Sequence, residues 1–169
     1  MTEEKTLLRA VVVFPVRRSK VLLAKKTSKI GAGCWNGYGG GIEEDELPSE
    51  AAVRELHEES GLIAKAENFK KVAEISFHNQ KEDRTMFTCR CNVFIVRSWT
   101  ARVRETEEMR TPTWFQITKP PLENMMPADR VWVPLIFSGW KIVGEAWYGP
   151  HQKMLLRPMK IRYVNILDV

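Results

Sequence analysis

A short acidic segment limits most strongly what this 169-residue chain can fold into. Pro48 suits the first turn of an α-helix and Gly61 suits the position just after its end, so we predict a helix between them. Within it Glu55, Glu58 and Glu59 are spaced i, i+3 and i+4, which places three carboxylates on one arc of the helix surface. Like charges at this spacing repel each other, and selection for stability alone would avoid them. The arc therefore indicates a function, although a Glu-rich helix in general is more often a solvated surface helix.

The surroundings of this arc suit a divalent metal ion. Ala52, Val53 and Leu56 give the helix an apolar face beside the carboxylates, so the acidic groups lie at the edge of whatever the helix packs on. Carboxylate oxygens are the ligands that Mg²⁺ prefers, and Mn²⁺ accepts them as well. A glycine cluster precedes the helix and lets the backbone approach a ligand, so a loop carbonyl, which we assign to Gly39, can complete the coordination shell.

One basic residue lies among these acidic groups. Arg54 has Glu50 and Glu58 at i−4 and i+4, and Glu46 lies further back, in the acidic turn formed by residues 43–46. An ion pair with any of the three would hold the turn against the helix. The spacing alone leaves the choice of partner open.

The spacing of the whole segment is more specific than the helix pattern. Reading from Gly40, the order is Gly-x5-Glu-x7-Arg-Glu-Leu-x-Glu-Glu-x-Gly-Leu, which ends at Leu62. This resembles the Nudix box at every fixed position. The resemblance implies the Nudix fold and a hydrolase that cleaves a nucleoside diphosphate linked to a further group. It also implies metal ligands and catalytic carboxylates at Glu55, Glu58 and Glu59, activation of water by Glu58 or Glu59, and a structural pair of Arg54 and Glu46.

Three further segments resemble one branch of that family, the oxidised-purine nucleoside triphosphatases of animals, which are MutT homologues. These segments are residues 31–46, residues 108–110 followed by 114–115, and residues 126–129 followed by Trp132. They occur in the same order over roughly residues 7–140. The resemblance implies Mg²⁺-dependent hydrolysis of an oxidised purine nucleotide, such as 8-oxo-dGTP, to a nucleoside monophosphate and pyrophosphate. Its biological role would be nucleotide pool sanitation.

The same resemblance implies substrate-binding residues. Alignment on Trp35 makes Lys26 the phosphate-contacting lysine, although a solvated lysine at a strand end is an equally good interpretation. Asn36 carries an amide donor and acceptor for a base edge, and Trp132 would line the base pocket rather than the core. Glu108 matches a carboxylate outside the box that reaches the metal, where the sequence alone favours an exposed glutamate.

The base pocket departs from this branch. There, a Trp-Pro pair is followed by two adjacent aspartates that hold the base edge below a stacking indole. This chain has Met126 in place of the tryptophan and Ala128-Asp129 in place of the two aspartates. Met126 can still press a polarisable thioether on a base, and Asp129 alone can accept hydrogen bonds from a purine N1–H and exocyclic amine. We therefore expect weaker discrimination between oxidised and normal purines than the branch usually shows.

Length and charge set further limits. We expect a single domain over residues 1–169, which is enough chain for one full core. No apolar run suits a signal peptide, and none approaches the roughly 20 residues of a membrane span, so we expect a cytoplasmic protein without a membrane partner. The net charge is +5 and the pI is near 9.2. Because the basic residues are scattered, a nucleic-acid partner is not required, and the positive field suits a nucleotide substrate. The sequence leaves the oligomeric state open.

Strand and helix patterns account for the rest of the chain. We predict strands, the first two as a hairpin, at residues 7–16, 20–26, 70–78, 85–97, 113–117, 141–148 and 160–167. A second helix is expected over residues 128–140, shortened or kinked by Pro134. Cys89 and Cys91 share one strand face and are predicted core residues, with metal binding as the alternative, while Cys34 is a candidate reactive thiol. These elements indicate an α/β (α+β) class with a mixed sheet sandwiched between helices.

Other functions are also compatible with the sequence. A Nudix-fold binding module is one, but such modules commonly lack box carboxylates, and none is missing here. A Nudix hydrolase of another nucleoside diphosphate derivative is a second. An RNA-binding or decapping Nudix protein is a third, and its RNA affinity would fall steeply with salt.

Overall fold

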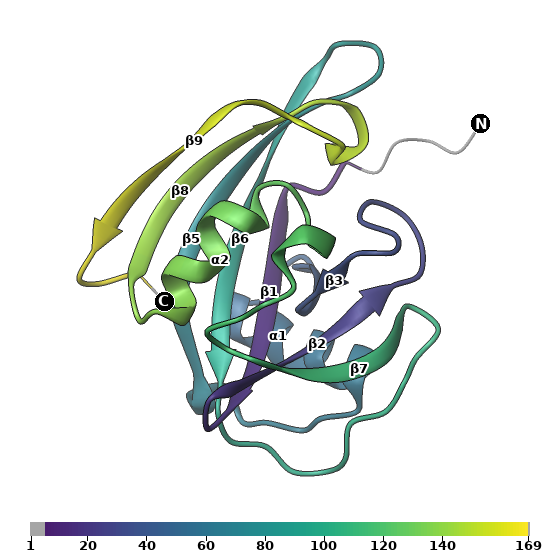
Figure 1. Cartoon of the computed structure of the whole chain (residues 1–169), viewed down its shortest axis with the longest axis vertical. Helices are drawn as coiled ribbons and strands as arrows, with labels where there is room; N and C mark the ends of the chain where they lie inside the picture. Colours follow the sequence, from purple (N-terminus) through teal and green to yellow (C-terminus); the bar gives the residue numbers. More distant parts are fainter. Residues whose placement is uncertain (1–5, 169) are drawn as a thin grey trace.

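The computed structural model describes residues 6–168, and Figure 1 shows them as a twisted sheet with helices beside it. Its strands are β1 (Arg9–Arg17), β2 (Lys20–Lys26), β3 (Trp35–Asn36), β4 (Tyr38–Gly41), β5 (Phe69–Gln80), β6 (Met86–Val96), β7 (Met109–Gln116), β8 (Lys141–Tyr148) and β9 (Leu155–Val164). Its helices are α1 (Pro48–Ser60), α2 (Asp129–Phe137) and the 3-10 turns η1 (Ala66–Asn68), η2 (Leu122–Asn124) and η3 (Pro150–Gln152). None of the helices in this range is long and apolar enough to span a lipid bilayer.

The strands form one mixed sheet in the order β3-β2-β1-β6-β5-β8-β9, with β4 paired to β1 and β7 paired to β2. The predicted hairpin is confirmed, because β1 and β2 pair antiparallel with Val16 opposite Val21. β1 pairs in parallel with β6, and β5 pairs in parallel with β8. Parallel neighbours need a crossover connection. In the chain, α1 lies between β1 and β6, and α2 lies between β5 and β8.

The two helices pack on opposite faces of the sheet. α1 buries Leu56 in a cluster that contains Val11 of β1. α2 buries Ile136 in a second cluster, which contains Ala10 of β1. Val11 and Ala10 are adjacent in a strand, so their side chains point to opposite faces. This arrangement confirms the predicted class, a mixed sheet between helices.

The ends of α1 confirm the prediction from its flanking residues. Pro48 is the first helical residue, and the side chain of Glu50 accepts a 2.9 Å hydrogen bond from the backbone N–H of Leu47. Gly61 follows the last turn with φ at 79° and donates its N–H to the backbone oxygen of His57 at 2.9 Å. The helix therefore ends at Ser60, two residues before the end of the box motif at Leu62. The three box glutamates lie in its last two turns.

Some element boundaries differ from the prediction. β7 begins at Met109, earlier than predicted, because it pairs with β2 as far as Lys26. β9 begins at Leu155, also earlier, because it continues to pair along β8. α2 keeps Pro134 inside it and ends at Phe137, so it is shorter than the apolar pattern, as predicted from Pro134. Where a strand begins because of its pairing with another strand, the local sequence carries no pattern that marks the boundary.

The two cysteines of β6 confirm the period-two pattern predicted there. Cys89 and Cys91 are 9% and 4% exposed, and both lie in the core cluster below α2. Burial raises the pKa of both thiols. They are therefore small core residues that stay protonated at neutral pH.

Candidate active site

The carboxylates of α1 lie where the helix meets the glycine strand β4. Glu59 is 9% exposed, and its Oε2 accepts a 3.0 Å hydrogen bond from the backbone N–H of Gly39. Glu55 packs on Gly40, where a Cβ atom would lie 2.6 Å from the Glu55 Oε1. A Cβ atom on Gly39 would lie 1.9 Å from the carbonyl oxygen of Val11 on β1. Glycine is therefore required for β4 to fit between β1 and these two glutamates.

Arg54 links the acidic turn to the carboxylates of α1. Its Nε and Nη2 each donate to an oxygen of Glu46 at 2.8 Å, and its Nη1 donates to Glu55 at 2.7 Å. Nη2 also donates to the backbone oxygen of Gly41 at 2.9 Å. The hydrogen bonds from Arg54 lower the pKa of Glu46 to about 2, and those with Glu46 raise the pKa of the guanidinium. Glu58 is 3.5 Å from Nη1, and its side chain is 57% exposed.

Glu108, from the segment before β7, meets Glu59. Burial is the main cause that raises the pKa of Glu59 to about 8, and the hydrogen bond from Gly39 opposes it. A hydrogen bond with Glu108 and the charges of Glu55 and Glu108 raise that pKa further. Burial also raises the pKa of Glu55, while Arg54 opposes this change. The fold therefore gathers more negative charge at this point than it neutralises.

Two residues that sequence reasoning missed support this arrangement. Thr106 Oγ1 donates to the backbone oxygen of Glu59 at 3.1 Å and accepts the backbone N–H of Met109 at 3.2 Å, which ties the Glu108 segment to the end of α1. Tyr38 on β4 is fully buried, and its hydroxyl has no hydrogen-bond partner among the described residues. Burial and the charge of Glu59 raise the pKa of Tyr38. Neither residue carries a motif that would have singled it out.

The chemistry of the carboxylates fits a divalent metal ion. Glu59 is buried beside two other carboxyl groups, and a hard cation is the group that relieves such an excess of negative charge. Within residues 6–168, no three His, Cys, Asp or Glu side chains are already spaced around a common metal position. Two features keep the carboxylates apart. Arg54 holds the Glu55 side chain by a 2.7 Å hydrogen bond, and the Glu58 side chain extends into solvent.

Other sequence-predicted residues gather at the start of α2. Asp129 is 6% exposed, and burial raises its pKa to about 7, while Trp132, the backbone N–H of Met126 and the charge of Lys26 lower it. The indole N–H of Trp132 is buried and lies near enough to Asp129 to favour the ionised carboxylate. Within the described part of the chain, however, it has no acceptor in good hydrogen-bond geometry. Both Met126 and Lys26 border Gly31, where a Cβ atom would lie 3.1 Å from the Met126 Sδ and 3.5 Å from the Lys26 Cδ. The structure thus brings these predicted residues together.

Two of the predicted substrate-binding residues lie at the ends of the paired strands β2 and β3, Lys26 on β2 and Asn36 on β3. The Lys26 ammonium donates to the backbone oxygen of Ile30 at 2.7 Å and lies close enough to lower the pKa of Asp129 and of Cys34. Asn36 is partly exposed on β3. Burial, with a smaller contribution from Asp129, nevertheless leaves the pKa of Cys34 above its usual value, which disfavours a reactive thiolate.

Comparison with known proteins assigns the family. The NUDIX domain family model matches residues 6–136, a stretch that contains both groups of residues. The chain belongs to the Nudix family. This Nudix chain is 36% identical over 134 residues to an oxidized purine nucleoside triphosphate hydrolase of Mus musculus, a match that covers 79% of the chain and 82% of the relative. The protein of the same name from Danio rerio is 36% identical over 140 residues, a match that covers 83% of this chain and 86% of the relative.

A solved structure supports the Nudix fold. The mutator MutT protein of Bacillus halodurans superposes with a TM-score of 0.77 at 22% identity, covering 92% of this chain and 97% of that protein. The chain is a Nudix hydrolase, and enzymes of this family typically depend on a divalent metal ion. The crowded carboxylates at the end of α1 agree with that dependence.

Proposed function

We propose that this Nudix hydrolase converts a nucleoside triphosphate to a nucleoside monophosphate and pyrophosphate. We propose an oxidised purine nucleotide such as 8-oxo-dGTP as the substrate and nucleotide pool sanitation as the role. The proposal depends most on one observation: a complete set of box carboxylates and a buried Asp129 occur in the same family-matched stretch. The likeness to the mouse and zebrafish hydrolases supports the substrate class.

The reaction depends on a metal held by the box. Its proposed ligands, four carboxylates and one carbonyl, are Glu55, Glu58, Glu59, Glu108 and Gly39. Mg²⁺, or Mn²⁺ in its place, would supply neutralisation of the phosphoryl oxygens and a lowered pKa of the attacking water. Arg54 orients Glu55 through its 2.7 Å hydrogen bond, in the way that outer contacts orient metal ligands. Glu58 or Glu59 accepts the proton of the attacking water.

The base is proposed to lie at the start of α2. The ionised Asp129 accepts hydrogen bonds from the N1–H and the exocyclic amine of a guanine-type edge, and the Asn36 amide reads a second edge. Trp132 and Met126 provide aromatic and thioether contacts to the ring. Lys26 offers a positive charge for the phosphates. Its position beside Asp129 also limits the cost of ionising that carboxyl group.

Turnover on a panel of nucleotides with Mg²⁺ tests this function. We expect the highest kcat/KM on an oxidised purine triphosphate, with release of pyrophosphate and not orthophosphate. The advantage over dGTP should be modest, because Ala128 leaves the pocket with one carboxylate. Best activity on a pyrimidine triphosphate or a nucleoside diphosphate sugar would overturn the base assignment and leave the Nudix chemistry in place. Preferred turnover of capped RNA would support the decapping alternative instead.

A further inference from the structure

Two hollows adjoin at the end of the β1–β2 hairpin. The larger has a volume of about 490 Å³ and the smaller about 350 Å³, and they share Arg17 and Trp114 as walls. The side chains that matter here are Arg17, Arg18, Lys20, Trp99, Arg102 and Trp114. Figure 1 shows the β1–β2 turn and the segment between β6 and β7 at the same lower end of the molecule. We call the two hollows together the hairpin hollow.

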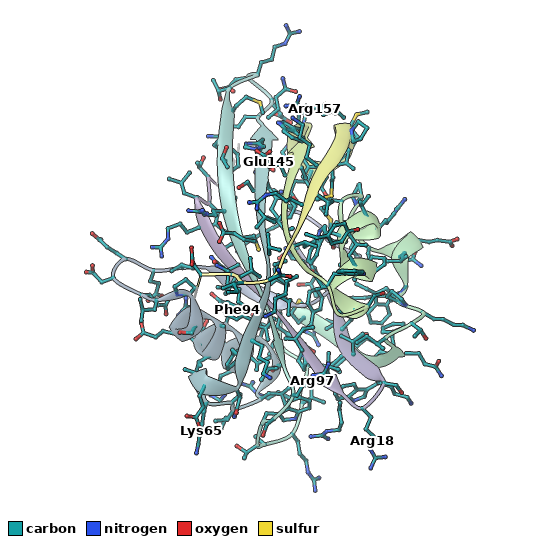
Figure 2. The ribbon with its side chains drawn as sticks, turned by 90° about the vertical axis from the view of Figure 1, so that its left-hand side faces the viewer. Arg18, Lys65, Phe94, Arg97, Glu145 and Arg157 are labelled. Atoms are coloured by element: carbon teal, nitrogen blue, oxygen red, sulfur yellow. The ribbon has the colours of Figure 1, made fainter. Side chains whose placement is uncertain are left out.

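The charge of the hairpin hollow is uniformly positive. Arg17, Arg18 and Lys20 come from the hairpin, and Arg102 comes from the segment before β7. Figure 2 shows Arg18 extending outward at the lower end of the molecule. No carboxylate is present among the described residues that line either hollow. Four cations attract a ligand with several negative charges where no carboxylate lies among the described lining residues, and guanidinium groups match phosphate in geometry.

The hairpin hollow also presents an aromatic surface. The rings of Trp99 and Trp114 lie nearly parallel, with centroids 6.1 Å apart and planes at 18°. The guanidinium carbon of Arg17 lies 4.5 Å from the centre of the Trp99 ring. Leu22 and Leu62, which are 0% and 1% exposed, form the floor of the smaller hollow. Indoles above an aliphatic floor suit a flat heteroaromatic ring, because every nucleobase has a face that stacks.

The hairpin hollow is distinct from the candidate active site. Val12 of β1 pairs with Gly39 beside the box carboxylates, and Arg17 ends the same strand five positions later. At about 3.3 Å per residue, this separation is roughly 17 Å along the strand. Among the described residues that line the two hollows, none is a proposed metal ligand or a proposed substrate-binding residue.

We infer that the hairpin hollow is a second nucleotide-binding site. It takes a nucleoside diphosphate or triphosphate with the base on the indoles of Trp99 and Trp114 and the phosphates at the four basic side chains. Arg17 serves both parts, because a guanidinium stacked on an indole keeps the N–H groups in its own plane available for phosphate. The inference goes beyond the hydrolysis proposed above and holds for any substrate of the catalytic site.

Calorimetric titration with ADP in the absence of metal tests the site. In the double variant Arg17→Gln/Arg102→Gln, we expect one class of ADP site to be lost or weakened at least tenfold. The matched control is Arg157→Gln/Lys160→Gln, because these cations lie 3.6 and 5.6 Å from the ring of Trp147 on β8, outside the hollow. The control should bind ADP as wild type does. Equal ADP binding by the hollow variant, or equal loss in the control, would overturn the inference.

Further probes separate the two halves of the ligand. Adenosine and inorganic pyrophosphate should each bind at least tenfold more weakly than ADP, and ADP should shift the indole N–H resonances of Trp99 and Trp114 most strongly. Pyrophosphate binding as tight as that of ADP would show that the indoles take no part and would overturn the assignment. An oligodeoxyadenylate that binds while ADP does not would replace the mononucleotide site with a single-strand site. Turnover enters none of these readouts, so an incorrect catalytic proposal would leave the binding result unchanged.

Discussion

Substitution of Asp129 probes the base-recognition half of the proposed site. Asp129→Asn keeps the shape and removes the charge, whereas Asp129→Ala removes the acceptor as well. The side chain is 6% exposed, and burial raises its pKa from 3.8 to about 7 despite the opposing effects of Trp132 and Lys26. Below about pH 7 the folded protein therefore holds this carboxyl in its neutral form.

The free energy of unfolding should depend on pH through this group. Because the folded protein binds the proton more tightly than the unfolded chain, the stabilisation is complete below pH 3.8 and is lost as the pH rises to about 7. At about 1.4 kcal/mol for each tenfold difference in proton affinity, the pKa difference corresponds to roughly 4 kcal/mol. Asp129→Asn lacks the group, so its stability relative to wild type should increase with pH by a value of this order.

Urea unfolding of the two proteins between about pH 4 and about pH 8 measures this difference. The other titrating groups are common to both proteins, so the difference between their free energies of unfolding isolates Asp129. A difference that stays constant within about 0.5 kcal/mol over this range would refute the account of a buried, protonated carboxyl group.

Catalysis should respond to pH in the opposite direction. The ionised carboxylate accepts both donors of a guanine-type edge, so wild-type kcat/KM on a purine triphosphate should rise as the pH passes about 7. A hydrogen bond to a charged group contributes roughly 1.5–3 kcal/mol, so Asp129→Ala should lower kcat/KM on the order of 10- to 100-fold above that pH. Steady-state kinetics on the best purine substrate provide the measurement. Equal hydrolysis by Asp129→Ala and wild type would remove Asp129 from the base pocket.

Three other substitutions test the box and its support. Glu58→Gln should lower kcat by orders of magnitude with an unchanged melting temperature, because the side chain is 57% exposed; near wild-type kcat at saturating Mg²⁺ would contradict its role as a ligand. Arg54→Ala removes two 2.8 Å hydrogen bonds to Glu46, so the melting temperature and Mg²⁺ affinity should fall together; lost activity with an unchanged melting temperature would make Arg54 a substrate contact. Gly39→Ala would place a Cβ atom 1.9 Å from the Val11 oxygen, so soluble yield and helical circular dichroism should fall; a stable, active variant would disprove this close approach.

Features decided by neighbouring residues could be predicted from the sequence. Pro48 and Gly61 mark the ends of α1 because the conformations of single residues favour those positions. The helical period alone places the box carboxylates on one arc, whatever the rest of the fold does. The same reasoning places Cys89 and Cys91 on one face of β6, where the structure buries both.

The partner of Arg54 shows where local reasoning stops. Helix spacing offers Glu50 and Glu58, and the acidic turn offers Glu46. In the structure Arg54 pairs most closely with Glu46 and Glu55, and Glu58 lies further away at 3.5 Å. Glu50 instead accepts the backbone N–H of the residue before the helix. Helix spacing predicts which glutamates Arg54 can reach. Which of them accepts its hydrogen bonds depends on the path of the acidic turn, and that turn follows strand β4, whose Gly41 carbonyl Arg54 also contacts.

The meeting of distant groups was decided by the tertiary structure alone. Glu108 reaches Glu59 because β7 pairs with β2 and because Thr106 ties the intervening segment to the end of α1. Ala128, just before Asp129, donates its backbone N–H to the Tyr148 hydroxyl at 2.8 Å, which anchors the start of α2 to β8. The sequence could name these carboxyl groups as candidates. Their proton affinities depend on burial and on neighbouring charges, and both are properties of the folded chain.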